Sequence, residues 1–289
     1  MSNQVILIDL FAILLRVYTA LPKWKNKAGV PTSMVVGFVK FLNKQFLENQ
    51  DATFIFCSES KHNSQQERGK LDENYKGNRT SVDEQASSQI GVCIKMLKDM
   101  GFKVLTYPGY EADDVIATLA TSLPKLGYTV QIYSTDKDFK QLVTIKTEDS
   151  PSEPGVYIVN PFNSTASVIC VEDVENEYGI HPKDFTKYQA LAGDLIDTIP
   201  AILTPKRAMS VVKTMGDKIE EALEPEQIER YRLNLQLVTL KTDLNLEFDI
   251  DKDFVDLQTG NPLLLKPVID LLTEYEAKKT IAGLYKWNT

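Results

Sequence analysis

Histidine and cysteine are scarce in this chain of 289 residues, which contains two histidines and three cysteines. Zinc sites draw most of their ligands from these two residue types, so the composition argues strongly against a zinc site of the histidine and cysteine kind. The cysteines, Cys57, Cys93 and Cys170, are widely spaced and odd in number. This pattern argues against a disulfide framework and favours a reducing compartment, so we expect a cytoplasmic protein.

The chain also lacks a long uninterrupted apolar segment. Its N-terminal stretch VILIDLFAILL is interrupted by Asp9 and has neither a basic region before it nor a small-residue cleavage site after it. We therefore predict neither a signal peptide nor a membrane span. With 43% hydrophobic and 25% charged residues, the composition is typical of a soluble globular protein, and the length fits one large domain or two smaller ones.

An excess of positive charge, which is usual in nucleic-acid-binding proteins, is missing as well, because the net charge is −8. Eight acidic residues in four short segments could account for this negative net charge. They are Asp9 in VILID, Glu111, Asp113 and Asp114 in GYEADDVIATLA, Asp136 and Asp138 in STDKDFKQLV, and Asp194 and Asp197 in GDLIDTIP. Basic residues are grouped between positions 61 and 79 and between 206 and 213, a grouping that a solvated charged helix face also explains.

Strand-like and helix-like segments alternate in the first half of the chain. Short apolar runs rich in β-formers lie at 5–8, 53–56, 103–107, 129–133 and 156–159, and helical patterns lie at 35–47, 85–100 and 112–123. This alternation predicts an α/β fold with a mostly parallel sheet flanked by helices. From about residue 171 the pattern is mainly helical, so we place a domain boundary near residue 172 and predict domains 1–172 and 173–289.

Most of the acidic segments follow a predicted strand. Function in parallel sheets gathers at the carboxyl ends of the strands, and there Asp9, the cluster at 111–114 and the pair Asp136 and Asp138 would meet. Carboxylates that converge from distant segments repel each other unless divalent cations lie among them, and Mg²⁺ and Mn²⁺ prefer oxygen ligands. Two such ions are a common arrangement for cleaving phosphodiesters, so the acidic segments point to a metal-dependent nuclease.

Each acidic segment also has a purely structural interpretation. Acidic residues stabilise the first turn of a helix, which explains one or two carboxylates in GYEADDVIATLA but not three within four residues. Asp136 and Asp138 could form a turn with the nearby backbone, and Asp194 or Asp197 could cap the next helix. An aspartyl-nucleophile phosphatase is a poor match, because it requires a second aspartate where this chain has Phe11.

The polar stretch 58–78 interrupts the alternation and becomes basic toward its end, so we expect a lid over the site, near residues 58–88. Lys76 and Arg79 on this lid could clamp the scissile phosphate and offset the charge of the transition state. An exposed charged turn is the alternative. After Asp9, Arg16 could bind phosphate and Tyr18 could stack on a base, although a tyrosine of the core is an equal alternative.

Together these motifs resemble the 5′-nuclease family of flap endonucleases, phage 5′–3′ exonucleases and the 5′-nuclease domain of family-A DNA polymerases. The resemblance runs through nearly the whole chain, including LLRVYTALP, RGKLDENYKGNR, GYEADDVIATLA, STDKDFKQLV and YQALAGDLIDTIP. It implies a PIN-like catalytic domain and a helical C-terminal region that resembles a helix–three-turn–helix DNA-binding domain. It also implies a monomer in a bacterial or phage-infected cell that hydrolyses DNA, and often RNA, near 5′ ends, flaps or junctions, leaving 5′-phosphate and 3′-hydroxyl ends. RNA–DNA hybrids are candidate substrates as well.

The resemblance also implies roles for individual residues, with two Mg²⁺ or Mn²⁺ ions as cofactors. Metal ligands would be Asp9, Glu111, Asp113 and Asp114 at the first position and Asp136, Asp138, Asp194 and Asp197 at the second. Lys76, Arg79 and Arg16 would act in catalysis, and DNA would be bound by Tyr18, Arg68, Tyr75, Lys206 and Arg207.

Three departures from the family pattern matter. Cys57 stands where the family usually carries an aspartate after its second strand, with Glu59 two residues later. The segment IPAILTPKRAM has none of the glycines that normally approach a DNA phosphate and a monovalent cation, so a K⁺ site at this turn is in doubt, while Lys206 and Arg207 could still contact DNA. Leu10 replaces a glycine. These departures leave open a DNA-structure-binding paralogue with weakened catalysis, and a small toxin-like RNase is a third, less favoured interpretation.

Overall fold

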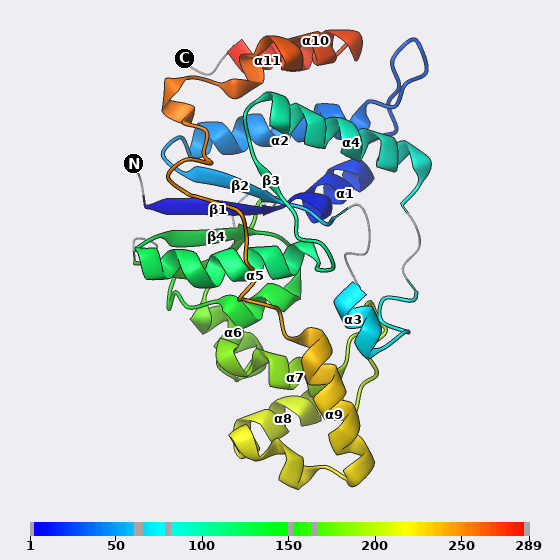
Figure 1. Ribbon diagram of the computed structural model, residues 1–289, viewed down its shortest axis with the longest axis vertical. Helices are drawn as coiled ribbons and strands as arrows, with labels where there is room; N and C mark the ends of the chain where they lie inside the picture. Colours follow the sequence, from blue (N-terminus) through cyan, green and yellow to red (C-terminus); the bar gives the residue numbers. More distant parts are fainter. Residues whose placement is uncertain (1–2, 61–65, 79–81, 150–152, 163–166, 286–289) are drawn as a thin grey trace. The chain divides into compact units, whose positions relative to one another are not determined.

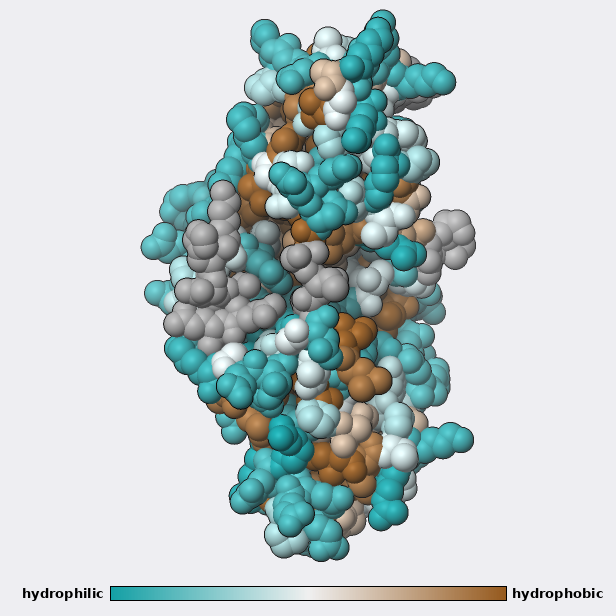
Figure 2. Space-filling model, turned by 90° about the vertical axis from the view of Figure 1, so that its right-hand side faces the viewer, coloured by the Kyte–Doolittle hydropathy of each residue, from teal (hydrophilic) through white to brown (hydrophobic). Residues whose placement is uncertain are grey.

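The computed structural model describes residues 3–60, 66–78, 82–149, 153–162 and 167–285. The chain forms two compact units, each assembled from separate stretches of sequence. The first unit comprises Met1–Ser58, Ser81–Leu105 and Glu247–Thr289, and the second comprises Glu59–Thr80 and Thr106–Leu246. Hydrophilic side chains cover much of the face drawn in Figure 2, with hydrophobic patches between them. No helix of the described residues combines the length and the apolarity needed to cross a bilayer.

Parallel strands form the centre of the first unit. Strand β2 (Thr53–Cys57) pairs in parallel with β1 (Gln4–Asp9) on one side and with β3 (Val104–Leu105) on the other. Both long strands are almost entirely buried, as expected for strands covered on both faces. The register places Asp9 directly beside Cys57 at the carboxyl ends of the two strands.

The described part of the first unit also contains five α-helices, which are labelled in Figure 1. They are α1 (Leu10–Ala20), α2 (Ser33–Glu48), α4 (Glu84–Asp99), α10 (Lys266–Glu274) and α11 (Lys278–Leu284). Helix α10 packs on α4, and α11 packs on α2. Residues 247–289 therefore belong to the same compact unit as the N-terminal strands, whereas the sequence-based division groups them with the rest of 173–289. The units are defined by packing alone, so a functional boundary near residue 172 stays a prediction.

The second unit contains the remaining described strands and the helix that carries the EADD motif. Strands β4 (Thr129–Tyr133) and β5 (Gly155–Asn160) are parallel, and β6 (Ser167–Ile169) pairs antiparallel with β5. Helix α5 (Ala112–Ser122) precedes β4, and a 3₁₀ helix, η2 (Lys137–Leu142), follows it. The short helix α3 (Gln66–Leu71) lies in the stretch expected to form a lid.

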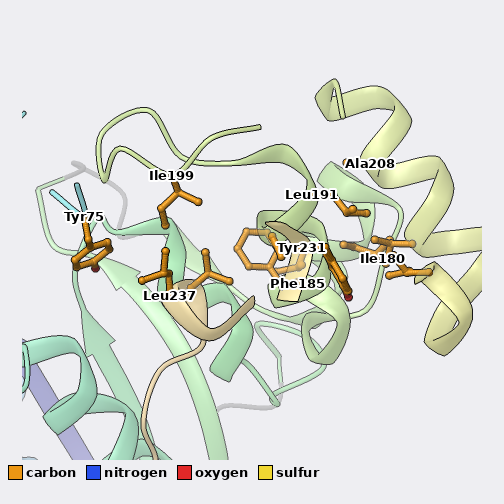
Figure 3. Packing of buried hydrophobic residues seen from close by; sticks show 13 residues of the cluster. Tyr75, Ile180, Phe185, Leu191, Ile199, Ala208, Tyr231 and Leu237 are labelled. Atoms are coloured by element: carbon orange, nitrogen blue, oxygen red, sulfur yellow. The ribbon is translucent and has the colours of Figure 1, made fainter. Parts of the chain in front are cut away.

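A second group of helices completes this unit. It contains α6 (Val171–Tyr178), α7 (Phe185–Ala192), α8 (Pro205–Met215) and α9 (Pro225–Val238). Their shared core includes Phe185, Leu191, Tyr231 and Leu237 (Figure 3). Tyr75 belongs to the same cluster, so the segment after α3 is anchored in the core of this unit.

The expected fold class is confirmed: a mostly parallel, mixed sheet flanked by helices. The strand expected at 103–107 is shorter than expected, Val104–Leu105, and the antiparallel β6 was not expected. The mainly helical pattern after residue 171 matches α6 to α9, while the helix–three-turn–helix detail stays a prediction.

Gly193 ends α7 and shapes the loop that carries Asp194 and Asp197. Its φ of 70° and ψ of 179° lie in a region that only glycine occupies readily. A Cβ atom here would lie 2.5 Å from the Ala201 nitrogen and 2.6 Å from the Ile199 oxygen. In this loop two backbone hydrogen bonds join Asp194 and Ile199, with N···O distances of 2.8 and 2.7 Å. They bring the chain around Ile199 close to Gly193.

We expect Gly193→Ala to lower the free energy of unfolding by roughly 3 kcal/mol, because backbone strain and a clash with backbone atoms add together. Gly179→Ala is the matched control, since Gly179 has a φ of 68° but a Cβ atom there would lie 3.8 Å from its nearest neighbour, the ammonium of Lys213. That control should lose only about 1 kcal/mol. Urea denaturation of both variants measures the difference, and equal losses would contradict this account of the loop.

Candidate functional site

Three aspartates of the second unit form a compact acidic group. Asp138 lies in the first turn of η2, and Asp194 and Asp197 lie in the loop after α7. Each offers one carboxylate oxygen, and these oxygens all lie within 4.8 Å of one another. Among the described residues there is no other group of three or more such ligands. Three oxygen donors at this spacing suit a hard divalent cation.

Hydrogen bonds and one ion pair hold these carboxylates in place. Asp138 accepts a hydrogen bond of 2.6 Å from the side-chain amide of Gln189. Asp194 accepts the backbone N–H of Ile196 at 2.9 Å, and its other oxygen is 2.9 Å from the ammonium of Lys137. Neither Gln189 nor Lys137 was singled out from the sequence, although the position of Lys137 between Asp136 and Asp138 was a usable signal. The three carboxylates are therefore preorganised by protein groups.

The electrostatic cost of the acidic group is visible in two pKa values. Burial and the charge of Asp136 raise the pKa of Asp138 to about 7, against the hydrogen bond from Gln189. Burial also raises the pKa of Asp136, and the charges of Asp197 and Asp194 add to this effect. A bound cation would relieve this repulsion.

Glu111, the N-cap of α5, is linked to Asp197 through a lysine and a tyrosine. The ammonium of Lys76 is 2.7 Å from Glu111 Oε1 and 3.7 Å from Asp197 Oδ2. The hydroxyl of Tyr75 is 3.2 Å from Glu111 Oε2 and 3.5 Å from Asp197 Oδ2. All four residues are buried, so two of the acidic segments singled out from the sequence meet around one buried cation.

Lys76 has an unusual backbone. Its φ is +56°, which is uncommon for a residue other than glycine, and its N–H donates to the carbonyl of Asp197 at 2.9 Å. Such conformations cost free energy and are concentrated at functional sites. The backbone and the side chain of Lys76 thus both contact the loop that carries Asp197.

The remaining predicted ligands of the second unit lie at the starts of η2 and α5, the helices that also carry Asp138 and Glu111. Asp136 is the N-cap of η2 and accepts the N–H of Asp138 at 2.9 Å. Asp113 is half-buried in the first turn of α5, and Asp114 is fully buried and paired with Arg68. Arg68 was expected to contact DNA, but its guanidinium is buried among protein groups.

In the first unit, Asp9 is the N-cap of α1 and accepts the N–H of Ala12 at 3.2 Å. Arg16 is exposed on α1, as a phosphate-binding role requires. Tyr18 is buried, and its hydroxyl is 3.0 Å from both carboxylate oxygens of Asp83. Lys23 lies over the Tyr18 ring, so this ring has protein partners rather than an open face for a base.

The predicted DNA contacts Lys206, Arg207 and Tyr75 and the predicted catalytic residue Arg79 remain to be placed. Lys206 and Arg207 are exposed in the first turn of α8, as DNA contacts should be. Arg79 lies outside the described residues. Tyr75 is buried beneath Glu111 and Asp197, where it orients carboxylates.

Comparisons with known proteins agree with this arrangement. A family model described as the 5′-3′ exonuclease, N-terminal resolvase-like domain, matches residues 4–179. A 5′-3′ exonuclease of Aquifex aeolicus is 30% identical over 291 residues and covers 97% of this chain and 94% of its own length. The thermostable DNA polymerase I of Thermus thermophilus is 30% identical over 264 residues, which are 86% of this chain but 30% of the polymerase.

Solved structures share the fold at low sequence identity. T5 5′-exonuclease with bound zinc ions has a TM-score of 0.62 and 21% identity, covering 94% of this chain and 97% of its own. Flap endonuclease-1 of Methanococcus jannaschii has a TM-score of 0.64 and 16% identity, covering 99% of this chain and 93% of its own. At these identities the likeness establishes the fold alone.

We expect Mn²⁺ or Mg²⁺ to raise the melting temperature of the metal-free protein by about 5 °C at saturation, because a ligand that binds the folded state at about 100 times its Kd stabilises by roughly 2.7 kcal/mol. Asp138→Asn should melt at a higher temperature than wild type without metal, because it removes a carboxylate whose pKa is raised, and both Asp138→Asn and Asp194→Asn should respond less to metal. Asp251→Asn makes the same chemical change at an exposed position of the first unit to which we assign no role. A full metal response in the Asp138 and Asp194 variants would contradict the assignment.

Proposed function

Because this chain belongs to the 5′-3′ exonuclease family and is accordingly a metal-dependent nuclease, we propose that it cuts DNA near 5′ ends, flaps or junctions. Hydrolysis would leave 5′-phosphate and 3′-hydroxyl ends, and RNA–DNA hybrids would be further substrates. The observation that carries this proposal is the group formed by Asp138, Asp194 and Asp197, joined to Glu111 through Lys76. Relatives named DNA polymerase I fit a role in replication and repair.

The donor set fits Mg²⁺ or Mn²⁺ and argues against softer ions. Carboxylate oxygens supply every proposed ligand, and the two ion positions would be held by Asp9, Glu111 and Asp113 and by Asp136, Asp138, Asp194 and Asp197. The set expected from the sequence also contains Asp114, whose carboxylate is paired with Arg68. When bound, such ions lower the pKa of a water molecule and neutralise charge on the phosphate. The protein's own contribution is to hold buried carboxylates at fixed spacing before any ion arrives.

Lys76 would be the principal cation of the protein at the reacting phosphate. Its ammonium is buried with Glu111 and Asp197, so it lies among the proposed ligands and could stabilise negative charge that grows in the transition state. Arg79 and the exposed Arg16 are proposed to assist it as phosphate-binding residues.

DNA binding would depend on the helical part of the chain. We propose that residues 1–172 carry catalysis, with a lid near 58–88, and that the DNA-binding surface lies within 173–289. Lys206 and Arg207 are exposed at the start of α8, where they could neutralise phosphates. A contact of Tyr18 with DNA near the cut and a K⁺ ion at the turn before α8 stay expectations drawn from the family.

A second candidate function is a DNA-structure-binding protein with weakened catalysis. The observation that favours it is Cys57, which lies directly beside Asp9 on the neighbouring strand where the family usually places an aspartate. A buried thiol is a poor ligand for Mg²⁺. Against it stands the cost of keeping several buried carboxylates close together without a cation.

We expect Asp113→Ala or Asp136→Ala to reduce Mg²⁺-dependent cleavage of a 5′-labelled flap by at least about 100-fold while the fold is retained. Asp251→Ala should cleave like wild type. Flap, gapped, blunt and RNA–DNA substrates, each with Mg²⁺ and with Mn²⁺, separate the two candidates: turnover of junction substrates supports the nuclease, and binding without turnover supports the paralogue. Junction-independent cleavage of single-stranded RNA would favour the toxin-like RNase.

Replacing Lys206 and Arg207 together with alanine should weaken binding of duplex DNA, because two phosphate contacts are lost. The slope of log Kd against log salt concentration should fall by about 2. Fluorescence anisotropy over a range from about 50 to about 200 mM salt measures this slope. Lys44→Ala on α2 is the control, because it removes an exposed charge from a helix to which we assign no DNA contact. An unchanged slope in the double variant would remove these residues from the DNA-binding surface.

A further inference from the structure

Arg68 is buried at the centre of a network that joins three segments of the second unit. Only 7% of its surface is exposed, although arginine is rarely buried. Its guanidinium donates to Asp114 through both terminal nitrogens, at 2.7 and 2.8 Å, and one of these nitrogens lies 3.2 Å from Glu111 Oε2. A parallel two-bond contact of this kind is the strongest and most directional pairing between arginine and a carboxylate.

The same guanidinium also binds the end of α9. Its Nε donates to the carbonyl of Leu237 at 2.9 Å, and Nη2 lies 3.4 Å from the carbonyl of Thr239. Carbonyls at a helix C-terminus have no partner within the helix and carry partial negative charge. Arg68 therefore stabilises the end of α9 while it binds the start of α5.

Asp114 has no acceptor position left for a metal ion. It is completely buried, and each of its oxygens accepts two N–H groups. Oδ1 accepts from Arg68 and from the backbone of Lys241 at 2.9 Å, and Oδ2 accepts from Arg68 and from the backbone of Glu111 at 3.3 Å. A carboxylate offers about four lone-pair positions, and these four donors occupy them.

Glu111 is held from two sides by different cations. Lys76 contacts Oε1, while Arg68 and the hydroxyl of Tyr75 contact Oε2. A carboxylate with a donor at each oxygen cannot rotate without losing one of them, so its plane is fixed. Lys76 and Tyr75 also reach Asp197, at 3.7 and 3.5 Å, whereas Arg68 pairs with Asp114 through two short hydrogen bonds.

We propose that Arg68 is a positioning residue for Glu111, and that Asp114 is the counter-ion of Arg68 rather than a metal ligand. This proposal rests on the proposed nuclease function and deepens it, since Glu111 is among the proposed ligands. The role of Arg68 is to fix Glu111, the start of α5 and the end of α9 relative to one another. A lysine could not replace it, because a single ammonium cannot reproduce the planar donor fork.

A cavity of about 390 Å³ adjoins this network and makes a direct test feasible. Its lining includes Arg68 itself, together with Glu67, Tyr110, Leu235 and Lys241. Truncating Arg68 to alanine would leave a space next to this cavity, large enough for a guanidinium ion to enter. Added guanidinium should therefore restore the cleavage rate that the truncation lowers, and an added ammonium ion should not.

The first experiment measures flap cleavage and thermal melting of Arg68→Lys and Arg68→Ala at saturating Mn²⁺. We expect kcat to fall by about 10- to 100-fold, the range seen when a residue that orients a metal ligand is removed, with KM for the flap unchanged. Millimolar guanidinium should recover kcat in Arg68→Ala but not in Arg68→Lys, whose side chain fills the space. A DNA-contact role would instead raise KM and reduce the salt dependence of binding.

The second experiment counts Mn²⁺ ions bound to the free protein by electron paramagnetic resonance. Asp113→Asn should weaken or lose one ion, whereas Asp114→Asn should keep the wild-type number. Because a single change leaves a buried charge unpaired and could prevent folding, the paired variant Arg68→Met with Asp114→Leu removes both charges together. It should fold, keep the wild-type number of ions and cleave slowly.

Loss of one ion at saturating Mn²⁺ in Asp114→Asn or in the paired variant, to the extent seen in Asp113→Asn, would overturn the proposal. So would wild-type kcat in Arg68→Lys. The ion count requires no substrate, so it tests the role of Asp114 even if wild-type protein cleaves none of the DNA substrates, an outcome that would count against the nuclease function itself.

Discussion

Buried carboxylates that lie close together need nearby positive charge, and this constraint governs the second unit. Glu111, Asp114 and Asp197 are all buried, and so are Lys76 and Arg68, the two cations beside them. An isolated buried charge costs several kcal/mol, while a paired and fully hydrogen-bonded one is tolerated. The two cations come from a single stretch around α3. The acidic helix start and the acidic loop can therefore stay buried only while this stretch is in place.

Structural and functional interpretations of the acidic residues are compatible with each other here. Asp9, Glu111 and Asp136 are N-caps, at positions where unpaired backbone N–H groups and the helix dipole favour negative charge. Capping lowers the cost of holding a carboxylate at a strand end or helix start. Asp114 is the exception, since all of its acceptor positions are occupied. The two-bond pair with Arg68, together with the two backbone donors, identifies Asp114 as a counter-ion despite its place in the motif.

Most of the fold could be predicted from the sequence, because short buried strands and amphipathic helices have distinct periodicities. The strands expected at 5–8, 53–56, 129–133 and 156–159 are all present. The acidic segments were found because carboxylates seldom accumulate where strands end. The partners of Arg68 could not be predicted in this way, since it meets Leu237, which is 169 positions away. A sequence pattern shows that a residue is basic but not whether its side chain faces DNA or a buried aspartate. For the same reason, the packing of residues 247–289 in the first unit was not foreseen.

Cys57 gives the strand ends of the first unit one carboxylate fewer than the family pattern, which has an aspartate at this position. The register places its buried thiol beside Asp9, so this pair of strand ends carries one carboxylate where an aspartate at position 57 would make two. The substitution removes a ligand, but it also removes a repulsion that cations would have to offset. The second unit keeps its acidic group, with Lys76 and Arg68 beside it. The acidic group of the second unit is intact whatever residue stands at position 57, and this favours a working nuclease over a decayed one.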